Sequence, residues 1–344
     1  MRGVYTAAYI AGLSKAFADR RGVADLDIGK GFDLIAGTST GAIVACAAAA
    51  GISMTDVVGL YREHGPHIFP IRLYDSFVRL SPQLLTRPHY LAQGNTALRS
   101  ALESILKDLT LGKIYKDRGI ALAVPAVEMS QQRAWVFKTS HLGGHRDDNF
   151  LLVDICLASS AAPIFRSLAS VPAPDSLGGQ LVFADGGLWA NNPILVGLID
   201  ALKMSERNRS IELFELGTCP RPEGEQIQPN DIHRGLIEWK FGGKAAQLSI
   251  SAQEFAFDNM ARMLGGILTD LGRSVHVLRF PNGKVPSSIL KYLDLDDARP
   301  GAMDALVAQA RADINFTLSA CDDPNNTDGQ LVRSLFMSIP TLQK

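Results

Sequence analysis

The sequence predicts an α/β fold with three layers, in which a mostly parallel central sheet is covered by helices on both faces. Two features predict it. Short apolar runs typical of buried strands alternate with stretches typical of helices, and polar motifs follow two of those runs, at Ser39 and Asp185. Ligands of open α/β sheets bind at the edge where such strands end. Because 47% of the 344 residues are hydrophobic, the chain can bury a large core, and we expect one domain over residues 1–344.

The first part of the chain is expected to contain three helices and one strand. Apolar and aromatic residues recur about four apart over residues 4–20, which predicts a helix. The apolar run 32–36 predicts a buried strand, the alanine-rich run 42–50 a helix that Gly51 ends, and residues 53–62 another helix. The apolar runs fall short of the ~18 residues that a membrane span needs.

Residues 64–90 are expected to be irregular, because four prolines stand in this segment. Two interpretations are left open: a lid or regulatory insertion, and an ordinary surface segment that packs on the body of the protein. Four arginines in or beside the segment suit either phosphate binding or a solvated face, namely Arg62, Arg72, Arg79 and Arg87.

Strands and helices alternate through the rest of the chain. The expected strands are 120–127, 134–139, 181–184, 211–217 and 275–280. The expected helices are 94–108, 150–162, 194–204, most of 232–272 and about 300–319, before a polar turn at 322–329. Strands separated by helices usually run parallel, and this alternation is why we expect a mostly parallel sheet.

A serine stands where a strand turns into a helix, in Gly37-Thr38-Ser39-Thr40-Gly41. A side chain on so sharp a turn stands above the sheet, and Gly37 and Gly41 on either side allow a strained backbone and close packing. Ser39 is therefore a candidate nucleophile at a helix N-terminus. The pattern is short, and a plain turn would also fit it.

The candidate base lies in Asp185-Gly186-Gly187, directly after the strand 181–184. Gly186 and Gly187 permit positive φ and a tight turn, and Asn192-Pro193 supplies a cap and a first residue for the next helix. The carboxylate is thus expected on the sheet edge that presents Ser39. Taken alone, the motif is also compatible with an aspartate that only stabilises a turn.

Together these segments resemble the patatin-like phospholipase family. The resemblance rests on Gly37 to Gly41, on Asp185 to Gly187 and on the linking run Ala158-Ser159-Ser160-Ala161-Ala162-Pro163. It implies a patatin-like αβα fold, with 1–200 as the catalytic core and about 205–344 as an extension of the same domain. It also implies that Ser39 attacks an acyl ester and that Asp185 is the base, in a Ser-Asp dyad without histidine.

Other classes of function find less support. A Ser-Asp-His triad of the α/β-hydrolase type would use His233 or His276, but at most one strand precedes Ser39, and local pattern explains both histidines. A net charge of −1 gives no basic field for nucleic acid. The sequence has no metal-ligand spacing and no phosphate loop, so we expect neither metal nor cofactor. The four cysteines are far apart and predict free thiols.

The resemblance is incomplete at the start of the chain. Patatin-like enzymes carry a glycine-rich loop, Asp-Gly-Gly-Gly-x-Arg-Gly, after a first strand, and Arg2 and Gly3 match only its last two positions. The Thr40 N–H could still stabilise an oxyanion, but the main oxyanion hole has no counterpart here. Two explanations compete: a longer reading frame whose upstream residues restore activity, and an impaired chain. The intact dyad favours the first.

Within the family, Tyr61 to Pro70 is similar to bacterial anti-phage effectors, which are phospholipases activated by a cyclic dinucleotide. We therefore expect a hydrolase of membrane glycerophospholipids, of the phospholipase A or lysophospholipase type, that is cytoplasmic and peripheral at the inner membrane when active. A cyclic dinucleotide is the expected activator, and a homo-oligomer is left open. The alternative is a catalytically impaired lipid-binding protein.

Overall fold

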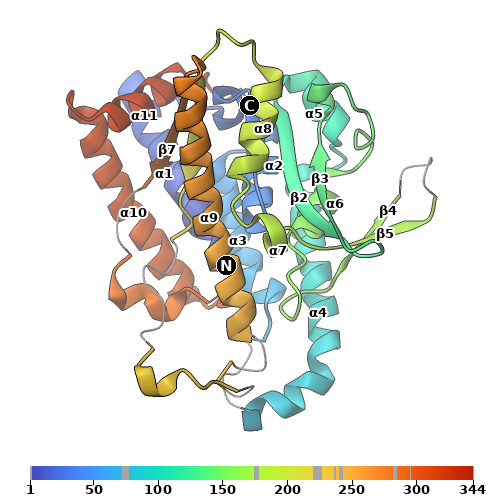
Figure 1. Cartoon of the computed structure of the whole chain (residues 1–344). Coiled ribbons are helices and arrows are strands. Elements are labelled where there is room, and N and C mark those ends of the chain that lie inside the picture. The colour runs from blue at the N-terminus through green and yellow to red at the C-terminus, as the bar shows by residue number, and fades with distance from the viewer. Residues whose placement is uncertain are drawn as a thin grey trace.

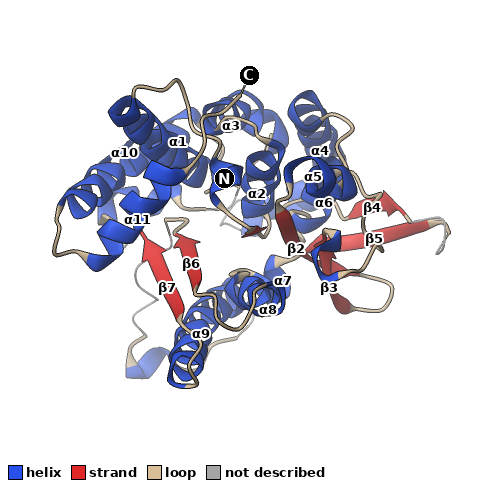
Figure 2. Ribbon diagram, turned by 90° about the horizontal axis from the view of Figure 1, so that it is seen from above, coloured by secondary structure: helices blue, strands red, loops and turns tan. Residues whose placement is uncertain are grey.

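The computed structural model describes residues 2–71, 77–173, 178–219, 227–235, 238–239, 243–281, 285–294 and 296–343. Its strands form a middle layer with helices on both sides (Figure 1, Figure 2). The α/β fold class predicted from the alternation of strands and helices is therefore confirmed.

The larger sheet has the strand order β1-β2-β5-β4, with β3 also paired to β2. Its strands are β1 Leu34–Ala36, β2 Ala121–Glu128, β3 Arg133–Lys138, β4 Ala169–Pro172 and β5 Gln180–Asp185. Strands β1 and β2 run parallel, whereas the pairs β2–β3, β2–β5 and β4–β5 are antiparallel. The sheet is thus mixed rather than mostly parallel, because short hairpin connections join β2 to β3 and β4 to β5.

The smaller sheet pairs β6 Ile211–Leu216 in parallel with β7 Val275–Phe280. Helix α8, Ile194–Met204, packs against both β1 and β6, and α9, Gly243–Asp270, packs against α8 and β7. In the described residues β1 pairs only with β2 and β6 only with β7, so each keeps one unpaired edge. Both strands line the same hollow of about 1990 Å³. The hollow therefore lies between the two sheets, and helix α8 packs against both of them.

The helices on the other face come from the two ends of the chain. They are α1 Gly3–Arg21, α2 Thr40–Ala50, α3 Met54–Ile68, α10 Pro300–Asp322 and α11 Thr327–Ser338. Two tyrosines of α1 hold α10: Tyr5 Oη donates to Asp313 Oδ2 at 2.5 Å, and Tyr9 Oη lies 2.6 Å from Thr317 Oγ1. The remaining α-helices are α4 Phe77–Leu106, α5 Leu111–Arg118, α6 Leu152–Ser159 and α7 Gly187–Ala190.

The prediction that residues 64–90 are irregular was wrong for most of the segment. Helix α3 continues to Ile68 through Pro66, and α4 begins at Phe77 and contains Pro88. The two helices touch closely, since a Cβ on Gly94 would lie 2.2 Å from the carbonyl oxygen of Ile68. Burial of such a contact outweighs the unfavourable local effect of proline.

Four further helices and strands were not predicted, namely α5, β4, α7 and α11. Helices α5 and α7 are short, and β4 and α11 lie in polar or proline-containing segments, where apolar periodicity is weak. In the described part of the chain, every helix falls short of the length and apolar character that a bilayer span requires.

Candidate active site

Ser39 lies at the sharp turn between β1 and α2, as the N-cap residue of that helix. Its backbone has φ 57° and ψ −125°, a region that residues with a side chain rarely adopt and that costs about 1–3 kcal/mol. Gly37 makes the turn sterically feasible, because a Cβ there would lie 2.4 Å from the carbonyl oxygen of Gly41. The turn therefore holds the Ser39 side chain in a strained, fixed position.

The Ser39 hydroxyl meets the carboxylate of Asp185, which ends β5. Ser39 Oγ donates to Asp185 Oδ2 at 2.7 Å, and the backbone N–H of Gly187 donates to Asp185 Oδ1 at 2.6 Å. Both carboxylate oxygens thus have a partner. Only 5% of Asp185 is exposed, so the contact is shielded from water.

The two glycines after Asp185 serve a purpose other than the predicted positive φ. Neither has a positive φ. A Cβ on Gly186 would lie 2.2 Å from the carbonyl oxygen of Pro125 on β2, so glycine is required by close approach. In Asn192-Pro193, the Asn192 side chain accepts the Ile194 N–H at 3.1 Å. Helix α8 nevertheless begins at Ile194 with Pro193 as its N-cap residue, one position later than predicted.

Burial raises the pKa of Asp185 to about 6. The hydrogen bond from Ser39, the Gly187 N–H and the positive charge of Arg166 oppose this rise, in that order. A carboxylate with a pKa close to neutrality can both accept and return a proton, which is what a general base in acyl transfer has to do.

Ser159 is a site residue to which the sequence motif assigned no role. Its Oγ accepts the backbone N–H of Ser39 at 2.9 Å and donates to the Pro125 carbonyl at 2.7 Å. It therefore fixes the strained turn to β2. The available signal was its place in the run from Ala158 to Pro163, which links the two motifs in sequence.

The structure brings the N-terminus of α1 to the Ser39 turn. A Cβ on Gly3 would lie 2.6 Å from Tyr61 Oη and 2.9 Å from Thr40 Cβ, so the two helix starts touch. Tyr61 Oη donates to the Thr40 carbonyl at 3.1 Å, and Arg2 lines the same hollow as Ser39. The Thr40 N–H donates to none of the residues that the structure describes.

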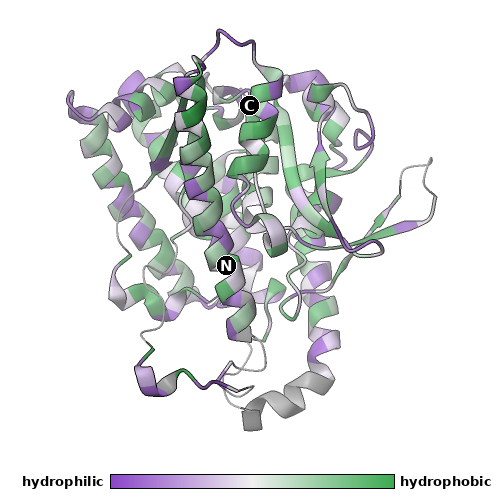
Figure 3. Ribbon diagram, viewed as in Figure 1, coloured by the Kyte–Doolittle hydropathy of each residue, from purple (hydrophilic) through white to green (hydrophobic). Residues whose placement is uncertain are grey.

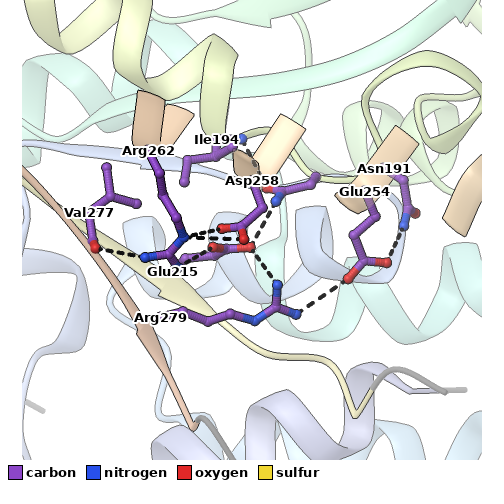
Figure 4. A network of polar contacts seen from close by, with 9 residues as sticks. Asn191, Ile194, Glu215, Glu254, Asp258, Arg262, Val277 and Arg279 are labelled. Atoms are coloured by element: carbon purple, nitrogen blue, oxygen red, sulfur yellow. Dashed lines mark hydrogen bonds and ion pairs between the residues drawn. The ribbon is translucent and has the colours of Figure 1, made fainter. Parts of the chain in front are cut away.

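A network of charged side chains braces the loop after Asp185 (Figure 4). Glu215 on β6 accepts from Asn192 at 2.8 Å and from Arg279 at 3.3 Å, and Asn191 Nδ2 donates to Glu254 on α9 at 3.1 Å. Burial raises the pKa of Glu215. The smaller sheet and α9 are thus tied to the segment that carries the aspartate.

The histidines considered for a triad lie elsewhere. His276 Nε2 is 3.4 Å from Asp328 Oδ1 and 44% of its side chain is exposed. Neither His276 nor His233 lines the hollow that contains Ser39. Within the described ranges no group of three or more His, Cys, Asp or Glu residues could hold a metal ion.

The two arginines near residues 64–90 whose side chains are described, Arg62 and Arg87, have separate partners. Arg62 pairs with Asp304, and Arg87 is buried and donates to the carbonyls of Ile71 and Ile164. The side chains of Arg72 and Arg79 lie outside the described part of the chain. The two described arginines thus bind groups of the protein itself.

Comparison with known proteins gives consistent matches. A sequence model of the patatin-like phospholipase family matches residues 1–198, which include Ser39 and Asp185. A cGAMP-activated phospholipase of Vibrio cholerae is 31% identical over 326 residues, 90% of this chain and 86% of that protein. A cGAMP-activated phospholipase of Pseudomonas aeruginosa is 32% identical over 77% of this chain and 72% of its own length. A cUMP-AMP-activated phospholipase of Escherichia coli is 28% identical over 76% and 75%, respectively.

Proposed function

The chain belongs to the patatin-like phospholipase family, and from this premise we propose that it hydrolyses membrane glycerophospholipids, with Ser39 as nucleophile and Asp185 as general base. One observation supports these roles above all others. It is the 2.7 Å hydrogen bond from the strained Ser39 to a buried carboxylate whose pKa is raised to about 6. A nucleophile within hydrogen-bond reach of a base is the arrangement that acyl transfer needs.

In the first half of the reaction Ser39 Oγ attacks the ester carbonyl while its proton passes to Asp185 Oδ2. The tetrahedral oxyanion collapses, the ester C–O bond breaks, and the leaving alcohol or lysophospholipid takes the proton from Asp185. In the second half a water molecule gives a proton to Asp185 and attacks the acyl group on Ser39. The fatty acid leaves and the proton returns to Ser39 Oγ.

The oxyanion needs N–H donors, and we propose that the Thr40 N–H is one of them. The hollow between the unpaired edges of β1 and β6 supports the expectation that a further strand belongs there. A strand in this position would join the two sheets and would end near Arg2, Gly3 and Thr40. We propose that the loop after such a strand supplies the remaining oxyanion donors.

A cyclic dinucleotide is the proposed activator, because the relatives named above include phospholipases activated by cGAMP and by cUMP-AMP. The proposed place of action is the inner surface of the cytoplasmic membrane. Three apolar side chains that line the hollow are also exposed, Ile164 by 59%, Leu188 by 44% and Phe255 by 69%. Met260, Met263 and Ile267 of α9 are exposed as well, and Figure 3 shows apolar residues along this helix. An apolar rim of this kind suits contact with lipid.

The test is release of fatty acid from phospholipid vesicles, with the chain extended upstream through its reading frame and with or without cyclic dinucleotides. Ser39→Ala should abolish release, and Ser104→Ala, which removes a hydroxyl of α4 outside the hollow, should not. Release that survives Ser39→Ala would refute the assignment. Reaction of Ser39 with a fluorophosphonate probe separates an enzyme from a lipid-binding protein, which would remain unlabelled.

A further inference from the structure

One buried cation stands in the wall of the hollow beside the Ser39–Asp185 pair. Arg166 is only 8% exposed and lines the same hollow as both residues. Its positive charge acts on the Asp185 carboxylate. The hydrogen bond between Ser39 and Asp185 is direct and does not involve this arginine.

A strained turn directs Arg166 into the hollow. The N–H groups of Phe165 and Arg166 both donate to the Ala162 carbonyl, at 3.1 and 2.8 Å, and Ile164, which lies inside this turn, has φ 75°. A β-branched residue with positive φ is a backbone outlier. Arg87 holds this conformation, since its Nε donates to the Ile164 carbonyl at 3.1 Å. The turn is therefore held in an unfavourable conformation that presents Arg166 to the site.

The protein itself uses little of the binding capacity of this guanidinium. Arg166 Nη2 donates to Asn95 Oδ1 at 3.1 Å, and across the described ranges no carboxylate lies within ion-pair distance of it. A guanidinium carries five N–H donors. None of the remaining donors is among the buried side-chain atoms without a partner in the described chain. Because Arg166 lines the hollow, these donors are available to a ligand there. Burying a cation without an ion pair is expensive, and a ligand of opposite charge would offset that expense.

We propose that Arg166 binds the phosphodiester of the lipid substrate and so selects phospholipids over neutral acyl esters. This inference rests on the proposed function. The planar guanidinium fork matches two oxygens of a phosphate. In a glycerophospholipid a short glycerol unit joins the phosphate to the ester that Ser39 would attack. An anion site in the same wall as Ser39 and Asp185 therefore fits the substrate better than it fits a separate activator.

The first experiment measures binding without turnover. Dodecylphosphocholine, which has a phosphodiester but no carboxylic ester for Ser39 to attack, and an uncharged dodecyl polyglycol ether are titrated below their micelle concentrations. Arg166→Gln should weaken binding of the phosphocholine about tenfold or more and leave binding of the uncharged ether unchanged. Arg166→Lys should recover part of the difference, and Arg20→Gln, which removes a surface cation paired with Asp322, should change neither. Equal weakening of both ligands would overturn the proposal.

The second experiment compares hydrolysis of a phosphatidyl ester with that of a neutral monoacylglycerol. Arg166→Gln should lower kcat/KM for the phospholipid about tenfold or more, mainly through KM, and leave the neutral ester within about threefold. A matching loss of kcat on both substrates would show that Arg166 only positions Asp185. If Arg166→Gln loses binding of cyclic GMP-AMP but keeps binding of the phosphocholine, Arg166 binds the phosphodiester of the activator and not that of the lipid. That result would overturn the lipid assignment. Because the binding arm needs no catalysis, it decides on Arg166 even if Ser39 proves unreactive.

Discussion

Replacing Asp185 by asparagine removes the proposed base. We also predict that the free energy of unfolding of the variant, relative to that of the wild type, rises from pH 4 to pH 7. The amide preserves the local contacts, because its Oδ1 can accept the Gly187 N–H and its Nδ2 can donate to Ser39 Oγ. What changes is the charge, which the wild-type protein has to bury at a position only 5% exposed.

The magnitude follows from the pKa of Asp185, which burial raises from 3.8 to about 6. The folded protein holds this proton up to about pH 6, whereas the unfolded chain has released it by about pH 4. The wild type therefore loses stability as the pH rises through this window. One pH unit corresponds to about 1.4 kcal/mol, so the whole loss is about 3 kcal/mol, of which about 2 kcal/mol falls between pH 4 and pH 7.

Urea unfolding of the wild type and of Asp185→Asn at pH 4, 5, 6 and 7 measures this difference. Any cost that does not depend on pH, such as a change in packing around the amide, cancels when the difference at one pH is compared with that at another. The free energy of unfolding of the variant minus that of the wild type should increase steadily as the pH rises. A difference that stays constant, or that decreases with pH, would refute the reasoning.

Four further substitutions test the Ser39 turn and the segment that follows Asp185. Ser39→Gly should stabilise the fold by about 1 kcal/mol, because glycine relieves the strain of φ 57°, and abolish labelling by a fluorophosphonate; thermal unfolding that falls below that of Ser39→Ala would contradict this. Gly186→Ala, whose Cβ would overlap a β2 carbonyl, should cost more than about 2 kcal/mol, while Gly41→Ala, with open space around it, should cost less than about 0.5 kcal/mol. Tyr61→Phe removes the hydrogen bond to Thr40 and should cost about 1 kcal/mol in urea unfolding; an unchanged midpoint would count against it.

Local pattern was sufficient for most of the strands and helices. The strands β2, β3, β5, β6 and β7 and the helix α8 lie where the apolar runs predicted them. Both motif segments stand at strand ends, as expected from the glycines that follow each apolar run. These features depend on side-chain periodicity and on glycine over a few residues, which the sequence states directly.

Predictions failed where distant contacts outweighed local preference. The prolines of residues 64–90 indicated an irregular segment, yet packing of α3 against α4 keeps most of it helical. The sheet is mixed because hairpins pair β2 with β3 and β4 with β5. Gly186 is required by a carbonyl of β2, about 60 positions earlier in the chain, and not by its own dihedral angles.

The sequence by itself determined the fold class, the family and the two residues most suited to the chemistry, because these follow from residue type and short-range order. Only the tertiary structure decided how they are arranged. It brings Ser39 within 2.7 Å of Asp185, 146 positions away, raises the pKa of that aspartate through burial, and turns Arg166 into the same hollow. Burial and long-range contacts arise between segments that are far apart in the chain, so no local pattern encodes them.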